Sequence, residues 1–263
     1  MKPYSMSTTS SAPPTSRVPQ IILLYWVIKI ASTTLGETAA DMFSMTYDLG
    51  YGSTIVLFLA IFLLLLLVKL YQRRYEPVTY WLTFTASAIA GTAISDYIDR
   101  VMDLGYAMGS LLLVSILGVI LALWYGTERS INVERVHTAR VETWYWLAFL
   151  IANTLGTAAG DYLADDLGLG FASGALVIST ALAVIAAAHL LTRRYATTLF
   201  WLAFVLTRPF GATFGDWLTK THEQGGIDLG TLGASAIFAA ILVVAVLREA
   251  QLERTGRPIR ELD

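Results

Sequence analysis

Four aspartates recur at one point of a repeated sequence pattern, each within a segment dominated by apolar residues. Every aspartate follows a tryptophan by fifteen residues and a glycine by five, so the pattern is W-x9-G-x4-D. The tryptophans are Trp26, Trp81, Trp146 and Trp201, the glycines are Gly36, Gly91, Gly156 and Gly211, and the aspartates are Asp41, Asp96, Asp161 and Asp216. Carboxylates that gather must share protons or hold a cation, because like charges repel. The pattern therefore predicts a cation site or a proton-coupled pathway.

Only oxygen ligands are available to such a cation. The chain contains no cysteine, which excludes disulfides and thiolate metal sites. Oxygen ligands suit a hard cation such as Mg²⁺, Mn²⁺, Ca²⁺, Na⁺ or H⁺ better than a soft metal. The alternative interpretation is structural, with each aspartate accepting hydrogen bonds from the free backbone N–H groups of the turn that follows its helix. Both interpretations stay open at this point.

Two charged residues break the fourfold pattern. Glu37 lies one helical turn before Asp41 on the same face, and Arg208 lies eight residues before Asp216. A charge near the middle of a bilayer costs between ~2.5 and ~10 kcal/mol or more, so it requires a cavity or a partner. We expect Arg208 to pair with Glu37 or with one of the aspartates. Glu37 would then exchange protons, and Arg208 would be a tethered cation that an incoming ion displaces. The alternative is a buried structural ion pair.

Other polar residues lie on the same helices. Helical spacing places hydroxyl groups on the stripe that carries the aspartates, and these supporting residues are Thr34, Thr92, Thr154, Thr157 and Thr213. Lys29 precedes Glu37 by two turns and is close enough to the expected helix start to extend its ammonium group to the membrane surface. Pro209 should kink its helix. The glycines of the repeat are expected to serve helix packing, and the tryptophans are interpreted as anchors at the membrane interface.

The elements that carry these residues are too apolar for a soluble domain. The chain is 56% hydrophobic and 14% charged, with a mean hydropathy of +0.60, whereas soluble domains carry about 25% charged residues. Eight segments are long enough to cross a hydrocarbon core of ~30 Å. Four are nearly uniformly apolar (55–70, 111–124, 175–191 and 234–247), and four carry the polar residues (20–46, 78–102, 142–164 and 198–219). The prediction is an all-α integral membrane protein with eight transmembrane helices.

The repeat makes four tandem two-helix units. An Asp-Leu-Gly tripeptide is expected to open the second helix of each unit, ending at Gly50, Gly105, Gly168 and Gly230. A shift of 120 residues also superposes the first pair of units on the second pair, which indicates two pseudo-symmetric halves. The predicted organisation is a disordered tail (1–19), a first half (20–126), a linker (127–141), a second half (142–248) and a C-terminal tail (249–263).

With its four tandem repeats and one characteristic tryptophan in each, the chain resembles a bacterial membrane-anchored protein family built from four two-span repeats. The resemblance covers about residues 20–250. It implies the architecture and no activity, because that family has no assigned function. The four polar helices are expected to line the centre of the bundle, and the four apolar helices are expected to form an outer layer in contact with lipid.

The charge distribution predicts an orientation. Most of the 18 basic residues fall on the side that holds both termini, and basic loops face the cytoplasm. We therefore expect a multi-pass protein of the cell membrane with cytoplasmic N- and C-termini and acidic outer loops. The expected partners are the lipid bilayer and a hard cation or protons. No nucleic acid and no cofactor are expected, and the oligomeric state stays open.

These features favour one function and leave one alternative. The favoured function is a transporter or channel for a small cation or cationic solute that uses the carboxylates within the membrane. The alternative is a sensor or assembly module whose polar helix faces serve packing. We do not expect an enzyme: the three histidines (His137, His189 and His222) have no ligand spacing, and the aspartate pattern is not that of an intramembrane protease.

Overall fold

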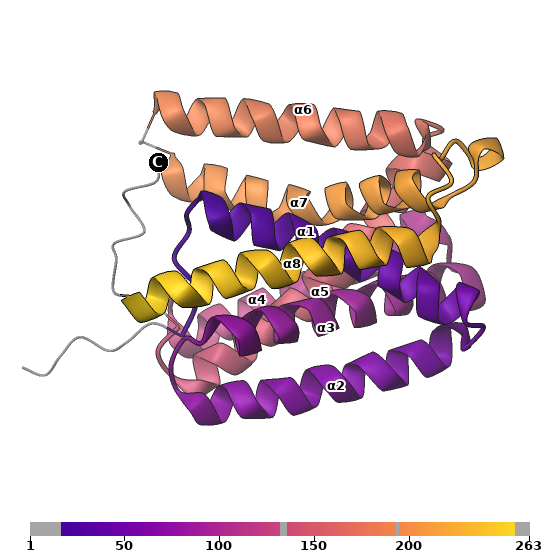
Figure 1. Cartoon of the computed structure of the whole chain (residues 1–263). Helices are drawn as coiled ribbons and strands as arrows, with labels where there is room; N and C mark the ends of the chain where they lie inside the picture. Colours follow the sequence, from indigo (N-terminus) through magenta and orange to yellow (C-terminus); the bar gives the residue numbers. More distant parts are fainter. Residues whose placement is uncertain (1–16, 132–135, 193–194, 256–263) are drawn as a thin grey trace, which may run out of the picture.

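The computed structural model describes residues 17–131, 136–192 and 195–255. Within these ranges the chain forms eight α-helices and no β-strand, so the prediction of an all-α protein built from two-helix repeats is confirmed (Figure 1). The helices are α1 (Leu23–Asp41), α2 (Gly50–Gln72), α3 (Pro77–Asp96), α4 (Gly105–Glu128), α5 (Ala139–Asp161), α6 (Gly170–Leu191), α7 (Ala196–Thr219) and α8 (Gly230–Thr255).

The four polar helices form a closed core. Helix α1 packs against α3, α3 against α5, α5 against α7, and α7 returns to α1. Each apolar helix covers the core helix of the following repeat: α2 packs on α3, α4 on α5, α6 on α7, and α8 on α1. In Figure 1, α2 and α6 accordingly lie at opposite edges of the bundle. No repeat is therefore a separate body, and the last repeat closes on the first.

The glycine of each repeat makes this core close-packed. Gly36 faces Ala88 on α3, and a Cβ added to Gly36 would lie 2.6 Å from Ala88 Cβ. Gly91 faces Asn153 on α5, and a Cβ added there would lie 3.1 Å from Asn153 Cβ. The last two contacts complete the circle, from Gly156 to Arg208 and from Gly211 to Thr33. The facing residues occupy equivalent positions in the four repeats. Such contacts agree with a packing role for the glycines, because the backbones could not approach so closely around a larger residue.

The outer helices differ from the core in hydropathy and exposure. Helices α2, α4, α6 and α8 are each long and apolar enough to cross a membrane, and at most 28% of the most apolar window of any of them is buried. In the described part of the chain these are the four helices that reach this apolarity. Helices α1, α3, α5 and α7 are shielded by them and carry buried polar side chains along most of their length. The expected division into a polar centre and an apolar outer layer is confirmed.

The turn before each outer helix requires a left-handed backbone conformation at the residue two positions before the helix starts. Asp48, Asp103 and Asp228 have φ angles of 55°, 56° and 60°, and in the third repeat Gly168 takes this position with φ 66°. Helix α6 accordingly begins at Gly170, so the expectation that the tripeptide ending at Gly168 opens it is wrong. The counterpart there is Gly-Leu-Gly, because glycine and, less readily, aspartate tolerate the left-handed region.

Three expectations about the chain ends and tryptophans also need correction. Residues 17–19 are buried rather than part of a disordered tail, and α8 continues to Thr255 into the predicted C-terminal tail. Residues 1–16, 132–135 and 256–263, which hold the rest of the predicted tails and part of the linker, lie outside the described ranges. Trp81 and Trp146 are 1% and 0% exposed, so they are not interfacial anchors. They are buried because α8 and α2 cover them: Trp81 Nε1 donates to Glu249, and Trp146 packs edge-on against Phe62.

Candidate functional site

The two residues that break the repeat pattern meet in the centre of the core. Arg208 on α7 and Glu37 on α1 are 3% and 2% exposed, and Arg208 Nη1 lies 3.4 Å from Glu37 Oε2. Arg208 Nη2 donates to the hydroxyls of Thr157 on α5 (2.7 Å) and Thr92 on α3. Both hydroxyls in turn donate to Glu37 Oε2, at 3.2 and 3.1 Å. Each core helix thus contributes one residue to this cluster, which we call the central cluster.

Local sequence explains why Arg208 can reach the centre. Its side chain crosses α5 at Gly156, where an added Cβ would lie 2.5 Å from Arg208 Cβ. The guanidinium group also makes long contacts of 3.4 Å with the carbonyl oxygens of Thr33 and Ala88. Its Nε is buried and has no hydrogen-bond partner among the described residues. The guanidinium is therefore bound at its Nη end and unsatisfied at Nε.

The four repeated aspartates lie beyond the central cluster, toward the ends of the core helices. They are at most 3% exposed, and two basic side chains divide them into pairs. Lys220 Nζ lies 2.8 Å from Asp41 Oδ2 and 3.2 Å from Asp216 Oδ1. Arg100 Nε lies 3.3 Å from Asp96 Oδ1, and its Nη2 lies 3.6 Å from Asp161 Oδ2. We call these six residues the aspartate layer.

The sequence did not identify Arg100 and Lys220 as partners of the aspartates. The signal was present, because each follows the aspartate of its own repeat by four residues, which is one helical turn. The corresponding positions in the other two repeats are Met45 and Asp165, so two repeats supply the basic residues for all four. Each basic side chain pairs with the aspartate of its own repeat and with that of the next repeat in the circle.

Lys220 stays charged in this layer. It follows the last residue of α7, where burial disfavours the ammonium form, but the carboxylates of Asp216 and Asp41 outweigh burial and raise the pKa of Lys220 above its ordinary value. The ammonium group of Lys220 is thus held between two carboxylates, in the place that a bound cation would take.

The structural alternative for the aspartates, backbone capping, does not describe these contacts. Asp41, Asp96 and Asp161 each precede a π-helical turn (Met42–Thr46, Tyr97–Val101 and Tyr162–Asp166), and none of the three caps that turn with its side chain. Both carboxylate oxygens of Asp96 and of Asp161 lack a hydrogen-bond partner among the described residues. The carboxylates are therefore turned toward charged side chains rather than toward backbone N–H groups.

The site contains more acidic than basic groups. The central cluster and the aspartate layer together hold five carboxyl groups in ion pairs with three basic side chains. Within the described ranges, no three histidine, aspartate or glutamate side chains are arranged to hold a metal ion. The aspartates thus form two pairs, each around its own basic side chain, with an excess of two carboxyl groups over the whole site.

The predicted threonines divide into two groups. Thr92 and Thr157 belong to the central cluster, whereas Thr154 and Thr213 donate to carbonyl oxygens of their own helices, at Leu150 (3.0 Å) and Pro209 (3.0 Å). The buried hydroxyl of Thr34 has no partner among the described residues. Two of the five threonines therefore contact the charged residues directly.

Lys29 does not extend to a surface as expected. It is 1% exposed, and its Nζ donates to Phe204 O (2.6 Å) and to Thr207 Oγ1 on α7, 3.5 Å from the centre of the Phe204 ring. No carboxylate of the described residues lies within ion-pair distance of it. The expectation is wrong because α7 covers this part of α1 and offers Lys29 a nearer set of acceptors.

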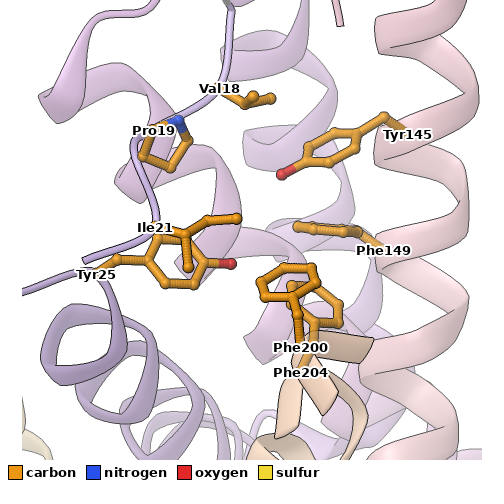
Figure 2. A pocket seen from close by; sticks show the side chains of 8 residues that line it. All are labelled: Val18, Pro19, Ile21, Tyr25, Tyr145, Phe149, Phe200 and Phe204. Atoms are coloured by element: carbon orange, nitrogen blue, oxygen red, sulfur yellow. The ribbon is translucent and has the colours of Figure 1, made fainter. Parts of the chain in front are cut away.

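Aromatic side chains close the opposite end of the core, where the core helices begin. Figure 2 shows Tyr25, Tyr145, Phe149, Phe200 and Phe204 converging there, with Val18 and Pro19 of the N-terminal segment above them. The space between these side chains is about 20 Å³, which holds roughly one water molecule. Arg17 fastens the segment through an ion pair of 2.6 Å with Glu142. We call this the aromatic end.

The comparisons with known proteins agree with the repeat. A family model described as Repeat of Unknown Function (DUF347) matches residues 24–75, 79–130, 144–195 and 199–255. Each match takes in one core helix, whole or nearly so, and the outer helix that follows it. No curated protein and no solved structure is significantly similar to the chain.

Proposed function

The chain belongs to the DUF347 repeat family, whose function is unknown, and we propose that it is a polytopic membrane protein that moves protons or a small hard cation across the bilayer. The first part of the proposal is the membrane location. Large apolar side chains cover the outer helices, with Leu64, Leu111 and Val244 exposed by 63%, 59% and 69%. An apolar surface that surrounds a buried charged core suits lipid and not water.

We propose eight crossings, although only the four outer helices among those described reach the apolarity of a membrane span by themselves. The aspartates that end the core helices gather in one layer, so α2, α4, α6 and α8 all start at that end of the bundle. If these four helices cross in the same direction, the chain must return between them through α3, α5 and α7. Helix α1 runs in the same core and completes eight crossings. The core helices can be less apolar because other helices, and not lipid, surround them.

We propose that the aromatic end faces the cytoplasm. Basic residues border that end, and the described ones include Arg17, Lys69, Arg73, Arg74, Arg129, Arg140, Arg248 and Arg254. Acidic residues predominate in the turns beyond the aspartate layer, and these are Asp48, Asp103, Asp165, Asp166, Glu223 and Asp228. Because basic loops stay in the cytoplasm, the aspartate layer and the acidic turns beyond it would face the outside.

The excess of carboxyl groups carries the functional proposal. Five buried carboxyl groups share three basic partners, and uncompensated charges are costly in a low-dielectric interior. Two protons, or the equivalent charge in small cations, would compensate this excess. Arg100 and Lys220 occupy the carboxylates as tethered cations, so an entering cation would displace one of them. Glu37 would then pass the charge inward beside Arg208.

The test is ion flux in liposomes that contain the purified protein. A proton gradient is imposed, and the fluxes of H⁺, Na⁺, K⁺, Mg²⁺, Mn²⁺ and Ca²⁺ are measured for the wild type and for Glu37→Gln and Asp161→Asn. Both variants remove a proton-binding carboxyl group with little change of shape, so we expect them to abolish the flux. Asp48→Asn is the matched control, because Asp48 is exposed and contacts neither cluster; its flux should equal that of the wild type.

One observation favours a purely structural role as the second candidate. Every carboxylate of the site is already in an ion pair, and each of the central-cluster contacts joins two different core helices. Such a network could serve helix packing in a sensor or assembly module. In that case the wild type conducts none of the six ions, while Glu37→Gln and Asp161→Asn lower the melting temperature. That combination would exclude transport of these ions.

A further inference from the structure

We propose that the cavity between α4, α5 and α7 binds the carboxylate head of a single-chain amphiphile that enters from the bilayer. The proposal rests on the membrane location proposed above and is independent of ion transport. It concerns Lys29 and the Nε edge of Arg208, neither of which is in an ion pair with the aspartate layer.

The cavity is large enough for a small ligand and opens sideways. Its volume is about 270 Å³, whereas a cavity of about 150 Å³ in another protein holds benzene. Apolar side chains dominate its wall, among them Leu117, Phe149 and Phe204. Val114 of α4 and Val205 of α7 also line it and are 52% and 53% exposed, so they mark its mouth on the outer surface of the bundle. The mouth would face acyl chains.

Two buried basic side chains lie at the inner wall of this apolar space. Lys29 and Arg208 both line the cavity and are 1% and 3% exposed, and no aspartate or glutamate lines it. A lysine ammonium has three N–H donors; Lys29 Nζ gives two of them to Phe204 O and Thr207 Oγ1. Arg208 Nε has no partner among the described residues. One N–H of each side chain thus has no hydrogen-bond acceptor among the described residues. Lys29 also lacks a carboxylate partner, so an incoming carboxylate would favour its charged form.

These donors define the ligand. An anion with two oxygen acceptors and one negative charge matches two N–H groups that lack acceptors, because Glu37 already compensates part of the charge of Arg208. A carboxylate meets this description. The apolar wall and the mouth between two exposed valines require the rest of the ligand to be a hydrocarbon chain that can extend into the bilayer. The ligand class is therefore a medium- or long-chain monocarboxylate.

The experiment measures binding of radiolabelled decanoate to the full chain in lipid nanodiscs, with decanol and decyl phosphate as competitors. We expect saturable binding of one decanoate per chain, and decanol should compete poorly because it lacks the charge.

Lys29→Met removes the ammonium group at similar length and should weaken decanoate binding by roughly tenfold or more, the effect of losing one charge-assisted hydrogen bond. Val114→Trp narrows the mouth and should weaken binding similarly. Val119→Trp is the matched control, because Val119 is also on α4, is 59% exposed and does not line the cavity.

Several results would overturn the proposal. The first is decanoate binding that neither Lys29→Met nor Val114→Trp weakens, and the second is a loss of decanoate binding in Val119→Trp equal to that in Val114→Trp. The third is competition by decanol as strong as competition by unlabelled decanoate. The fourth is tighter binding of decyl phosphate than of decanoate, which would assign the site to a phosphate head. If Lys29→Met does not fold, the comparison of the two valine variants decides. Loss of ion flux in Asp161→Asn with decanoate binding unchanged would separate this site from the proposed transport pathway.

Discussion

At the scale of single residues, the charged contacts of the core are departures from the repeat. Position 208 holds arginine where the other repeats have Thr33, Ala88 and Asn153, and position 37 holds glutamate one turn before the shared aspartate. The ion pair between them could be anticipated, because buried charges of opposite sign on neighbouring helices require each other. The hydrogen bonds of Thr92 and Thr157 to this pair could not be anticipated, because they depend on all four core helices meeting at one depth.

The first residue-scale prediction concerns the energy of this pair. Glu37→Gln alone leaves Arg208 as a buried charge without its anion and should reduce the free energy of unfolding by about 3–5 kcal/mol. Arg208→Met alone should cost a similar amount. The double variant should be more stable than the sum of the two losses predicts, because neither charge is then left unpaired. Denaturation of the four proteins in detergent measures the coupling; strict additivity would show that the pair contributes nothing.

At the scale of elements, the packing of the core depends on a circle of glycines. The sequence identified Gly36, Gly91, Gly156 and Gly211 as packing residues from their repetition alone. It did not identify what they pack against. In the structure each glycine packs against a residue of the next repeat, the one that lies three positions before that repeat's own glycine. Gly156 therefore packs against Arg208. The same repeated contact thus both closes the core and positions its most unusual charge.

The element-scale prediction is a comparison of two glycine substitutions. Gly156→Ala would force the Arg208 stem and Pro209 away from α5 and should destabilise the protein by about 1–3 kcal/mol, the usual cost of overpacking. It should also weaken the contact between Arg208 and Thr157. Gly118→Ala is the control, because nothing lies within 4 Å of a Cβ at that exposed position of α4. Alanine there should be neutral or stabilising. Equal melting temperatures for the two variants would contradict the packing argument.

At the scale of the whole molecule, the four repeats form a closed circle, which their order along the chain does not predict. The outer helix of each repeat covers the core helix of the next, and α8 covers α1, so the first and last repeats are neighbours. Sequence similarity suggested two halves, yet α3 packs on α5 and α7 on α1 across the boundary between them. The halves therefore describe the internal repetition of the sequence, whereas the contacts follow the fourfold circle.

The whole-molecule prediction tests the eight crossings. The chain has no cysteine, so single cysteines can be introduced and labelled with a maleimide that does not cross membranes. Tyr47→Cys, Met102→Cys and Glu223→Cys should be labelled in intact cells, whereas Tyr71→Cys and Leu191→Cys should be labelled only after permeabilisation. All five positions are exposed, so burial does not explain a missing label. If only the four outer helices crossed, positions 47 and 102 would lie on opposite sides.

The sequence by itself determined the helical class, the four repeats, the division into polar and apolar helices and the residues that depart from the pattern. These features are local, because composition and spacing along one chain record them. Only the tertiary structure decided which residues meet. Arg100 and Lys220 each join two repeats, Lys29 is buried under α7, and Arg208 passes over Gly156. Such contacts depend on the order in which helices pack around the core, and many packing orders share the same periodicity.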